Sequence, residues 1–99
     1  MKIPKKVKIG GVYYPITQVE NLYQDFNAWG RVDISTQQIY LQMNTPVSPI
    51  SDGRMQQSLV HEIVHVMLDD VGHRELSKDE DFVERFSNIL YQVIEDNKL

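Results

Sequence analysis

Two histidines and a glutamate in the middle of the chain have the spacing of a metal-dependent hydrolase. His61, Glu62 and His65 form an H-E-x-x-H motif. On a helix, residues four apart lie one turn apart on the same face, so both imidazoles can bind one Zn²⁺ at about 2.0–2.1 Å. Glu62 is rotated by about 100° from His61 around the helix axis. Its carboxylate is therefore free to take a proton from a water molecule that the metal activates, and the motif predicts Glu62 as a general base.

A catalytic zinc usually takes a third protein ligand, and the segment after His65 offers several. The candidates are His73, Glu75, Asp79, Glu80, Asp81 and Glu84. His73 comes eight residues after His65 and so departs from the metzincin pattern, whose third histidine comes six residues after the second. Helical phase does not choose among the carboxylates. Glu80 also has a competing structural use, because Ser77 and Glu80 fit a capping box at a helix start.

The segment that carries the motif is predicted to be one long helix. We expect Ser51 or Asp52 to cap it, and the helix to run from about Gly53 to Val71, where Gly72 ends it. Apolar residues fill most of its circumference, and the motif's polar side chains share one narrow stripe with Asp69. A buried polar stripe needs partners, so this pattern favours a metal site over a plain core helix. Asp69 is a candidate to orient a histidine through a hydrogen bond.

The N-terminal half is predicted to form two β-hairpins. Residues 6–9 and 12–19 alternate around Gly10-Gly11, and residues 31–34 and 38–42 alternate around a turn at 35–37. Pro15 within the second run predicts an edge position or a break. In the second hairpin, one face is expected to carry Val32, Ile34, Ile39 and Leu41.

A second long helix is predicted from about Lys78 to Asp96. Its apolar face is made of Phe82, Val83, Phe86, Ile89, Leu90, Val93 and Ile94. We expect this face to pack against the first long helix and the sheet. The result is a single α+β domain over residues 1–99, with a small, mostly antiparallel sheet of about four strands and two long helices.

Composition excludes several other classes. The chain has no cysteine and a net charge of −4, so it has no disulfide or thiolate ligand, and nothing resembles the clustered basic face of a nucleic-acid-binding protein. No apolar run approaches the roughly 20 residues of a membrane span, and the basic start lacks the apolar stretch of a signal peptide. We therefore expect a cytoplasmic protein without a nucleic-acid or membrane partner.

Several stretches together resemble one known family. They are Lys8–Val12, Gly30–Asp33 with Ile39–Leu41, Leu59–His65, and Asp79–Val83 through Leu90–Val93. The chain is similar to the small, often phage-encoded members of the ImmA/IrrE-like zinc metallopeptidases. This resemblance implies a minimal zincin-like domain and a third zinc ligand at Glu80. An alignment on the later apolar residues could instead place Asp81, or Phe82, at that position. It also implies that an edge strand, either 31–34 or 38–42, borders the substrate cleft.

Two functions follow as expectations. The first is a zinc metallopeptidase that cuts a cytoplasmic protein or peptide, such as a regulatory protein of a phage or mobile element. Zn²⁺ would be held by His61, His65 and Glu80, and Glu62 would be the base. Possible oxyanion donors are His73, Tyr40 and Tyr91. The alternative is a zinc-binding interaction or regulatory module without proteolysis.

Overall fold

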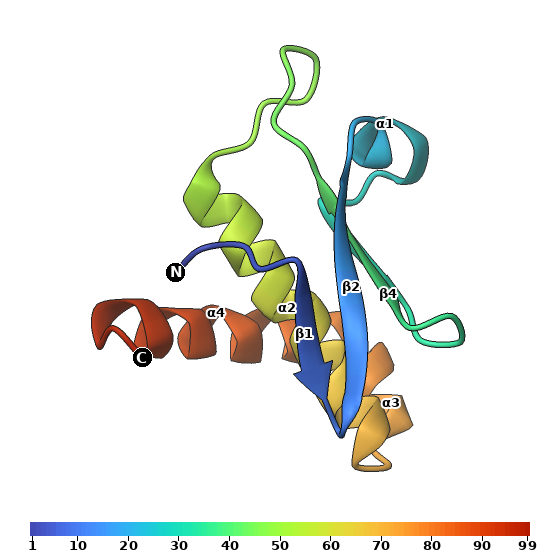
Figure 1. Cartoon of the computed structure of the whole chain (residues 1–99). Helices are drawn as coiled ribbons and strands as arrows, with labels where there is room; N and C mark the ends of the chain where they lie inside the picture. Colours follow the sequence, from blue (N-terminus) through green and yellow to red (C-terminus); the bar gives the residue numbers. More distant parts are fainter.

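A four-stranded sheet and four helices make up the fold in the computed structural model, which describes all 99 residues (Figure 1). The elements in chain order are β1 (Lys6–Ile9), β2 (Val12–Val19), α1 (Leu22–Phe26), β3 (Gly30–Asp33), β4 (Gln38–Gln42), α2 (Asp52–Asp70), α3 (Arg74–Lys78) and α4 (Glu80–Asp96). The predicted α+β class is therefore confirmed, with the strands in the N-terminal half and two long helices in the C-terminal half. None of the helices combines the length and the apolar composition that crossing a membrane would require.

The sheet has the strand order β1-β2-β4-β3. Both predicted hairpins are present, since β1 pairs with β2 and β3 pairs with β4 in antiparallel fashion, but β2 and β4 are parallel. Pro15 marks the change of partner within β2, because residues 12–15 pair with β1 and residues 16–19 pair with β4. The residue that cannot donate a backbone hydrogen bond thus lies where one ladder ends and the next begins. It does not lie on an edge strand, because β2 is internal.

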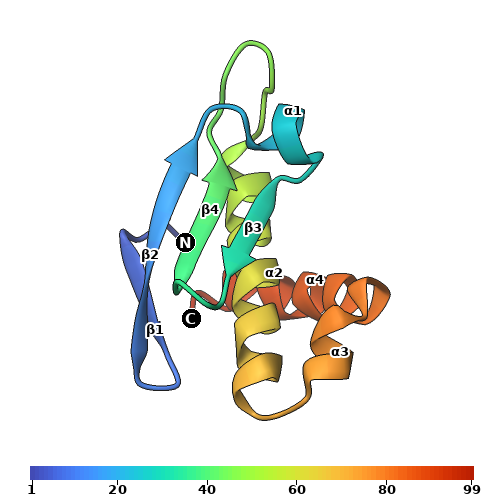
Figure 2. The same cartoon turned by 90° about the vertical axis from the view of Figure 1, so that its right-hand side faces the viewer.

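Strand β3 is the free edge of the sheet on the side of α2 (Figure 2). The alternative that residues 38–42 form the edge is wrong, because β4 lies between β2 and β3. Ile34 falls just beyond β3 and its residue surface is 37% exposed. It therefore does not share the buried face of Ile39 and Leu41 as predicted.

Helix α2 covers one face of the sheet (Figure 2). The core between them consists of Tyr14, Ile39, Leu41, Ile50, Met55, Leu59 and Val66. The helix begins where predicted, with Ser51 as N-cap: its side chain accepts a hydrogen bond from the Arg54 amide at 3.1 Å. Burial does not extend to the last turn, where Met67 is exposed. The central turns, which carry the H-E-x-x-H motif, are thus the most firmly held part of the helix.

Helix α4 crosses α2 (Figures 1 and 2). Fewer of its residues are buried than in α2. It packs mainly on α2 and α3, so the prediction that its apolar face also packs on the sheet is wrong. Of that face only Val83 is fully buried, and Phe86, Ile89 and Val93 are exposed. The predicted helix is present and ends at Asp96 as expected, but it begins at Glu80, because Asp79 caps it and Lys78 belongs to the preceding helix α3.

Candidate metal centre

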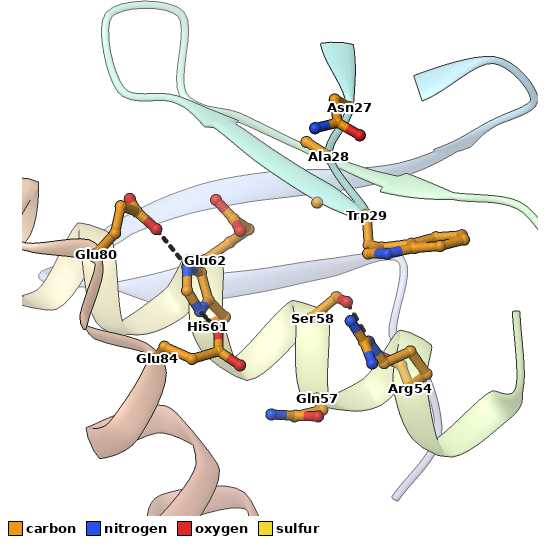
Figure 3. Close-up of a pocket in the computed structure, with 11 residues that line it drawn as sticks. Asn27, Ala28, Trp29, Arg54, Gln57, Ser58, His61, Glu62, Glu80 and Glu84 are labelled. Atoms are coloured by element: carbon orange, nitrogen blue, oxygen red, sulfur yellow. Dashed lines mark hydrogen bonds and ion pairs between the residues drawn. The ribbon is translucent and has the colours of Figure 1, made fainter. Parts of the chain in front are cut away.

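Three side chains from two helices converge on one point beside α2. His61 and His65 lie one turn apart on α2. Glu80 is the first residue of α4 and faces His61 (Figure 3). The Nε2 atoms of the two histidines are 3.2 Å apart. Glu80 places Oε2 at 3.2 Å from Nε2 of His61 and Oε1 at 3.0 Å from Nε2 of His65. The structure therefore brings the two predicted histidines and the predicted glutamate together.

These spacings match what a zinc ion requires. Ligand atoms at 2.0–2.1 Å from a tetrahedral ion are roughly 3.3 Å from one another. The distances of 3.0–3.2 Å among the three groups are close to this value. Two imidazole nitrogens and one carboxylate oxygen are also a donor set of the kind found in catalytic zinc sites. The residues present thus fit the ion in both geometry and chemistry.

The other ring nitrogen of each histidine has its own acceptor. Nδ1 of His61 lies 3.0 Å from Oε2 of Glu84 and 3.5 Å from Oγ of Ser87. Nδ1 of His65 lies 3.4 Å from Oγ of Ser77, and that hydroxyl donates to the carbonyl of His65 at 3.0 Å. A proton held on each Nδ1 leaves each Nε2 with a free lone pair. The partners therefore orient both rings for binding a cation through Nε2.

Burial supports the same protonation state at His65. The pKa of His65 is lowered from its ordinary value, mainly because burial disfavours the charged imidazolium; the nearby Glu80 carboxylate opposes this shift. A neutral imidazole is the form that binds a metal. At neutral pH this ring is accordingly in the state that a metal site needs.

The alternative ligands lie elsewhere. Asp81 is exposed and pairs with Arg85 one turn later, and His73 is an exposed residue before α3. Glu84 approaches the site, but its contact is with Nδ1 of His61, the nitrogen that faces away from Glu80. Asp69 pairs with Arg74 at 3.4 Å, so its expected role as the partner of a histidine is wrong.

The predicted capping box is also wrong. Asp79, rather than Ser77, caps α4, and its side chain accepts from the Phe82 amide at 3.1 Å. Ser77 instead lies in α3 and uses its hydroxyl on His65. Glu80 is thereby free of a capping role and can face the two histidines.

Glu62 lies beside the histidines, between α2 and β3. Only 6% of its residue surface is exposed, and Gly30 approaches it so closely that a Cβ there would be 3.1 Å from Oε2 of Glu62. The pKa of Glu62 is raised to about 8, first because burial disfavours the carboxylate and then because Glu80 and Glu84 are nearby; the Val32 amide opposes this shift. The environment thus brings the pKa of this carboxyl group near neutral pH, where the group can both take and give a proton.

The free edge of β3 borders the same site. The Trp29 carbonyl accepts from the Gln42 amide at 2.9 Å, so the odd-numbered residues of β3 direct their backbone groups toward β4. By the alternation of an antiparallel pair, Gly30 and Val32 direct theirs outward. Two adjoining hollows, one lined by Gly30 and the other by both Gly30 and Val32, lie between this edge and the histidines. An open cleft therefore runs past the candidate metal centre, with the outward backbone groups of β3 on one wall and the Val32 amide directed at Glu62.

None of the suggested oxyanion donors lines this cleft. The Tyr91 hydroxyl donates to Gln56 at 2.7 Å, and Tyr40 lines a separate hollow together with α1 residues. His73 likewise is not part of the cleft wall. These residues are therefore not available as donors beside the histidines.

Sequence reasoning named Glu84 as a candidate ligand and Ser77 as a helix cap, and so missed that both orient the histidine rings. Glu84 had a usable signal, because it lies four residues after Glu80 and hence one turn along the same face of α4. Nothing in the sequence indicated the role of Ser77, because its contact with His65 depends on how α3 folds back onto α2. The only sequence feature of Gly30 was its position before an alternating strand. That position does not indicate that Glu62 approaches it closely.

Comparisons with family models, with curated proteins and with solved structures each found no match to this chain. The similarity to ImmA/IrrE-like peptidases therefore remains a prediction from the sequence motifs.

Proposed function

We propose that the protein is a zinc-dependent metallopeptidase. The observation that carries the proposal is the convergence of His61, His65 and Glu80 next to the buried Glu62, at a cleft with a free strand edge. The three ligating groups would hold one Zn²⁺ and leave the cleft side open for a substrate. Such an ion would act as a Lewis acid that polarises a peptide carbonyl and acidifies the attacking water.

Glu62 would carry out the proton transfers. A carboxylate oxygen of Glu62 would accept a proton from the attacking water and then deliver it to the nitrogen of the departing amine. Its burial beside the two histidines suits this task, because the carboxyl group is held next to the point where the metal would bind its water. Gly30 supports the same role, since a Cβ there would press on the carboxyl group, which would have to shift by a few tenths of an ångström.

The edge of β3 would hold the substrate. An extended peptide can add to an open strand edge through main-chain hydrogen bonds, which are largely independent of its side chains. Gly30 provides outward backbone groups directly beside Glu62, and Val32 provides an outward carbonyl, while its amide is directed at Glu62. A peptide bound there would present its main chain to the two histidines. We further propose that the substrate is a cytoplasmic regulatory protein, in keeping with a chain that has no cysteine.

Glu62→Gln is the direct test of the proposed chemistry. Zinc-loaded wild-type protein should cleave members of a quenched fluorescent peptide library, whereas the Glu62→Gln variant should bind zinc equally well and cleave about 100- to 10,000-fold more slowly. Metal content measured by emission spectroscopy and cleavage followed by fluorescence give the two readouts. Chelation should abolish the wild-type activity, and added zinc should restore it.

The outcomes separate the two functions considered. Equal turnover by Glu62→Gln and wild type would exclude Glu62 as the base. One zinc per chain without cleavage of any library member would favour a zinc-binding interaction module instead. No zinc in the wild type, even after it is supplied, would overturn both.

A further inference from the structure

Arg54 is the one lysine or arginine among the residues lining the hollow beside His61 and Glu62. Its side chain forms no ion pair in the structure, and its guanidinium carbon lies 5.9 Å from the centre of the Trp29 ring. Figure 3 shows Arg54 and Glu80 at opposite ends of this hollow, with His61 between them. A permanently charged group at the end of a cleft, without an anionic partner in the chain, is suited to a charge on the substrate.

The distance from Arg54 to the histidines is set by α2. Seven residues, or two turns, separate Arg54 from His61 on the same face, which corresponds to about 10 Å along the axis. Gln57 and Ser58 line the hollow between them. An extended peptide rises about 3.4 Å per residue. Arg54 is therefore about three peptide residues away from the position where a bond would be cleaved.

The direction of the peptide follows from β3. The hollow at the Arg54 end is lined by residues 27–30, and the adjoining hollow at the other end is lined by residues up to Ile34, together with Lys78. Strand β3 thus runs from the Arg54 end toward the Lys78 end. A peptide pairing with it in the more common antiparallel sense runs the opposite way, so its C-terminal part lies at Arg54.

We infer that Arg54 binds a carboxylate about three residues after the scissile bond, and that the preferred substrate is a peptide with an acidic side chain or a free C-terminus at that point. This inference rests on the proposed metallopeptidase function. The guanidinium can bind a carboxylate with two parallel hydrogen bonds. The side chains of Asn27 and Gln57, which line the same hollow, provide further donors. The Trp29 ring lies on one side of the guanidinium, with its centre 5.9 Å from the guanidinium carbon.

The test uses zinc-anchored probes, which require no knowledge of the natural substrate. Each probe carries a hydroxamate, which binds zinc, in front of a tripeptide. The first ends in alanine-alanine-glutamate amide, the second in trialanine with a free carboxylate, and the third in trialanine amide, which is neutral. Titration calorimetry with the zinc-loaded full chain should show at least one acidic probe binding about fivefold tighter than the neutral probe. Whichever acidic probe is preferred identifies the source of the carboxylate.

Two variants assign the effect to one end of the cleft. Arg54→Gln should remove the preference for acidic probes and leave the neutral probe unchanged. Lys78→Gln, which removes a cation from the other end, should leave the preference intact. Both side chains are exposed, so neither substitution disturbs the core.

Each remaining outcome overturns a particular statement. Equal binding of all three probes to wild type would leave the zinc site standing and refute the role of Arg54. Loss of the preference in Lys78→Gln rather than in Arg54→Gln would refute the orientation of the peptide. Failure of every probe to bind would overturn the proposed function, and the inference with it.

Discussion

Helices α2 and α4 provide the two halves of the candidate metal centre under very different conditions. Helix α2 buries seven residues, including Glu62, whereas α4 buries only Val83 and Ser87. The histidine side chains from α2 are 15% and 13% exposed, but the Glu80 side chain from α4 is 70% exposed. One half of the site is thus fixed by the core, and the other half is provided by a helix that the rest of the chain holds loosely.

This difference suggests that a bound metal would matter more for α4 than for α2. Segments with few buried apolar contacts open at a low cost in free energy, without unfolding the whole molecule. A ligand that bridges two elements stabilises most the element that is held least. Zinc would therefore act in part as a clamp that joins α4 to a preformed α2.

The largest effect that we predict comes from this clamp. Zinc at about a hundred times its dissociation constant should raise the free energy of unfolding by about 2.7 kcal/mol. Amide hydrogen exchange should slow by a larger factor in α4 than in α2, because α2 is already held by the core. Thermal unfolding and exchange followed by mass spectrometry measure the two effects.

A neighbouring pair of carboxylates gives the matched control. Glu80→Gln should weaken zinc binding by at least about tenfold and remove the slowing of exchange in α4. Asp81→Asn, one residue away and paired only with Arg85, should behave as wild type. Equal protection of both helices by zinc would show that they are held equally well, contrary to their burial. A defect in Asp81→Asn alone would reassign the third ligand.

The next largest effect is a pH dependence of stability. It comes from Glu62, which lies on α2, the buried half of the site. Its pKa is raised from 4.5 to about 8, mainly by burial and then by Glu80 and Glu84. A carboxyl whose pKa is higher in the folded state than in the unfolded state binds protons more tightly when folded. The resulting stability is fully present below about pH 4.5 and is lost as the pH rises through about 8.

Metal-free protein should accordingly lose on the order of 2 kcal/mol from this group between pH 5 and pH 8. Glu62→Gln keeps the shape without the ionisation, so it should lose much less stability over that range. Urea unfolding in the presence of a chelator, repeated across the pH range, tests this difference. Parallel pH profiles for the variant and the wild type would show that Glu62 ionises in the folded protein without a penalty.

Local patterns in the sequence predicted much of this architecture. Alternation and Gly10-Gly11 predicted both hairpins, and Ser51 with the apolar run after it predicted the start of α2. The i and i+4 spacing of His61 and His65 predicted that both rings face one point. All of these depend on residues that are near one another in the chain.

The features that sequence could not predict depend on distant contacts. The parallel pairing of β2 with β4 joins two hairpins that the chain pattern presents as independent units. The local pattern predicted Ser77 as the cap of α4, but Asp79 takes that position. The Ser77 hydroxyl instead lies 3.4 Å from Nδ1 of His65 and donates to the His65 carbonyl. The amphipathic pattern of α4 indicated an apolar face correctly but did not indicate how little of it would be covered.

The smallest effect that we predict tests how little of the apolar face of α4 is buried. Val83 is fully buried, whereas Ile89 is 57% exposed. Val83→Ala removes two methyl groups from the contact with α2 and should lower the free energy of unfolding by about 1.5 kcal/mol. Ile89→Ala removes more atoms but should change that free energy by less than about 0.5 kcal/mol, because water already surrounds them.

Urea unfolding of the metal-free variants measures both values. Residue size and burial make opposite predictions for this pair, since the larger truncation is at the exposed position. A larger loss at Ile89 than at Val83 would mean that the exposed face of α4 is covered in solution. That result would remove the contrast between the two helices and, with it, the reason to expect that zinc stabilises α4 more than α2.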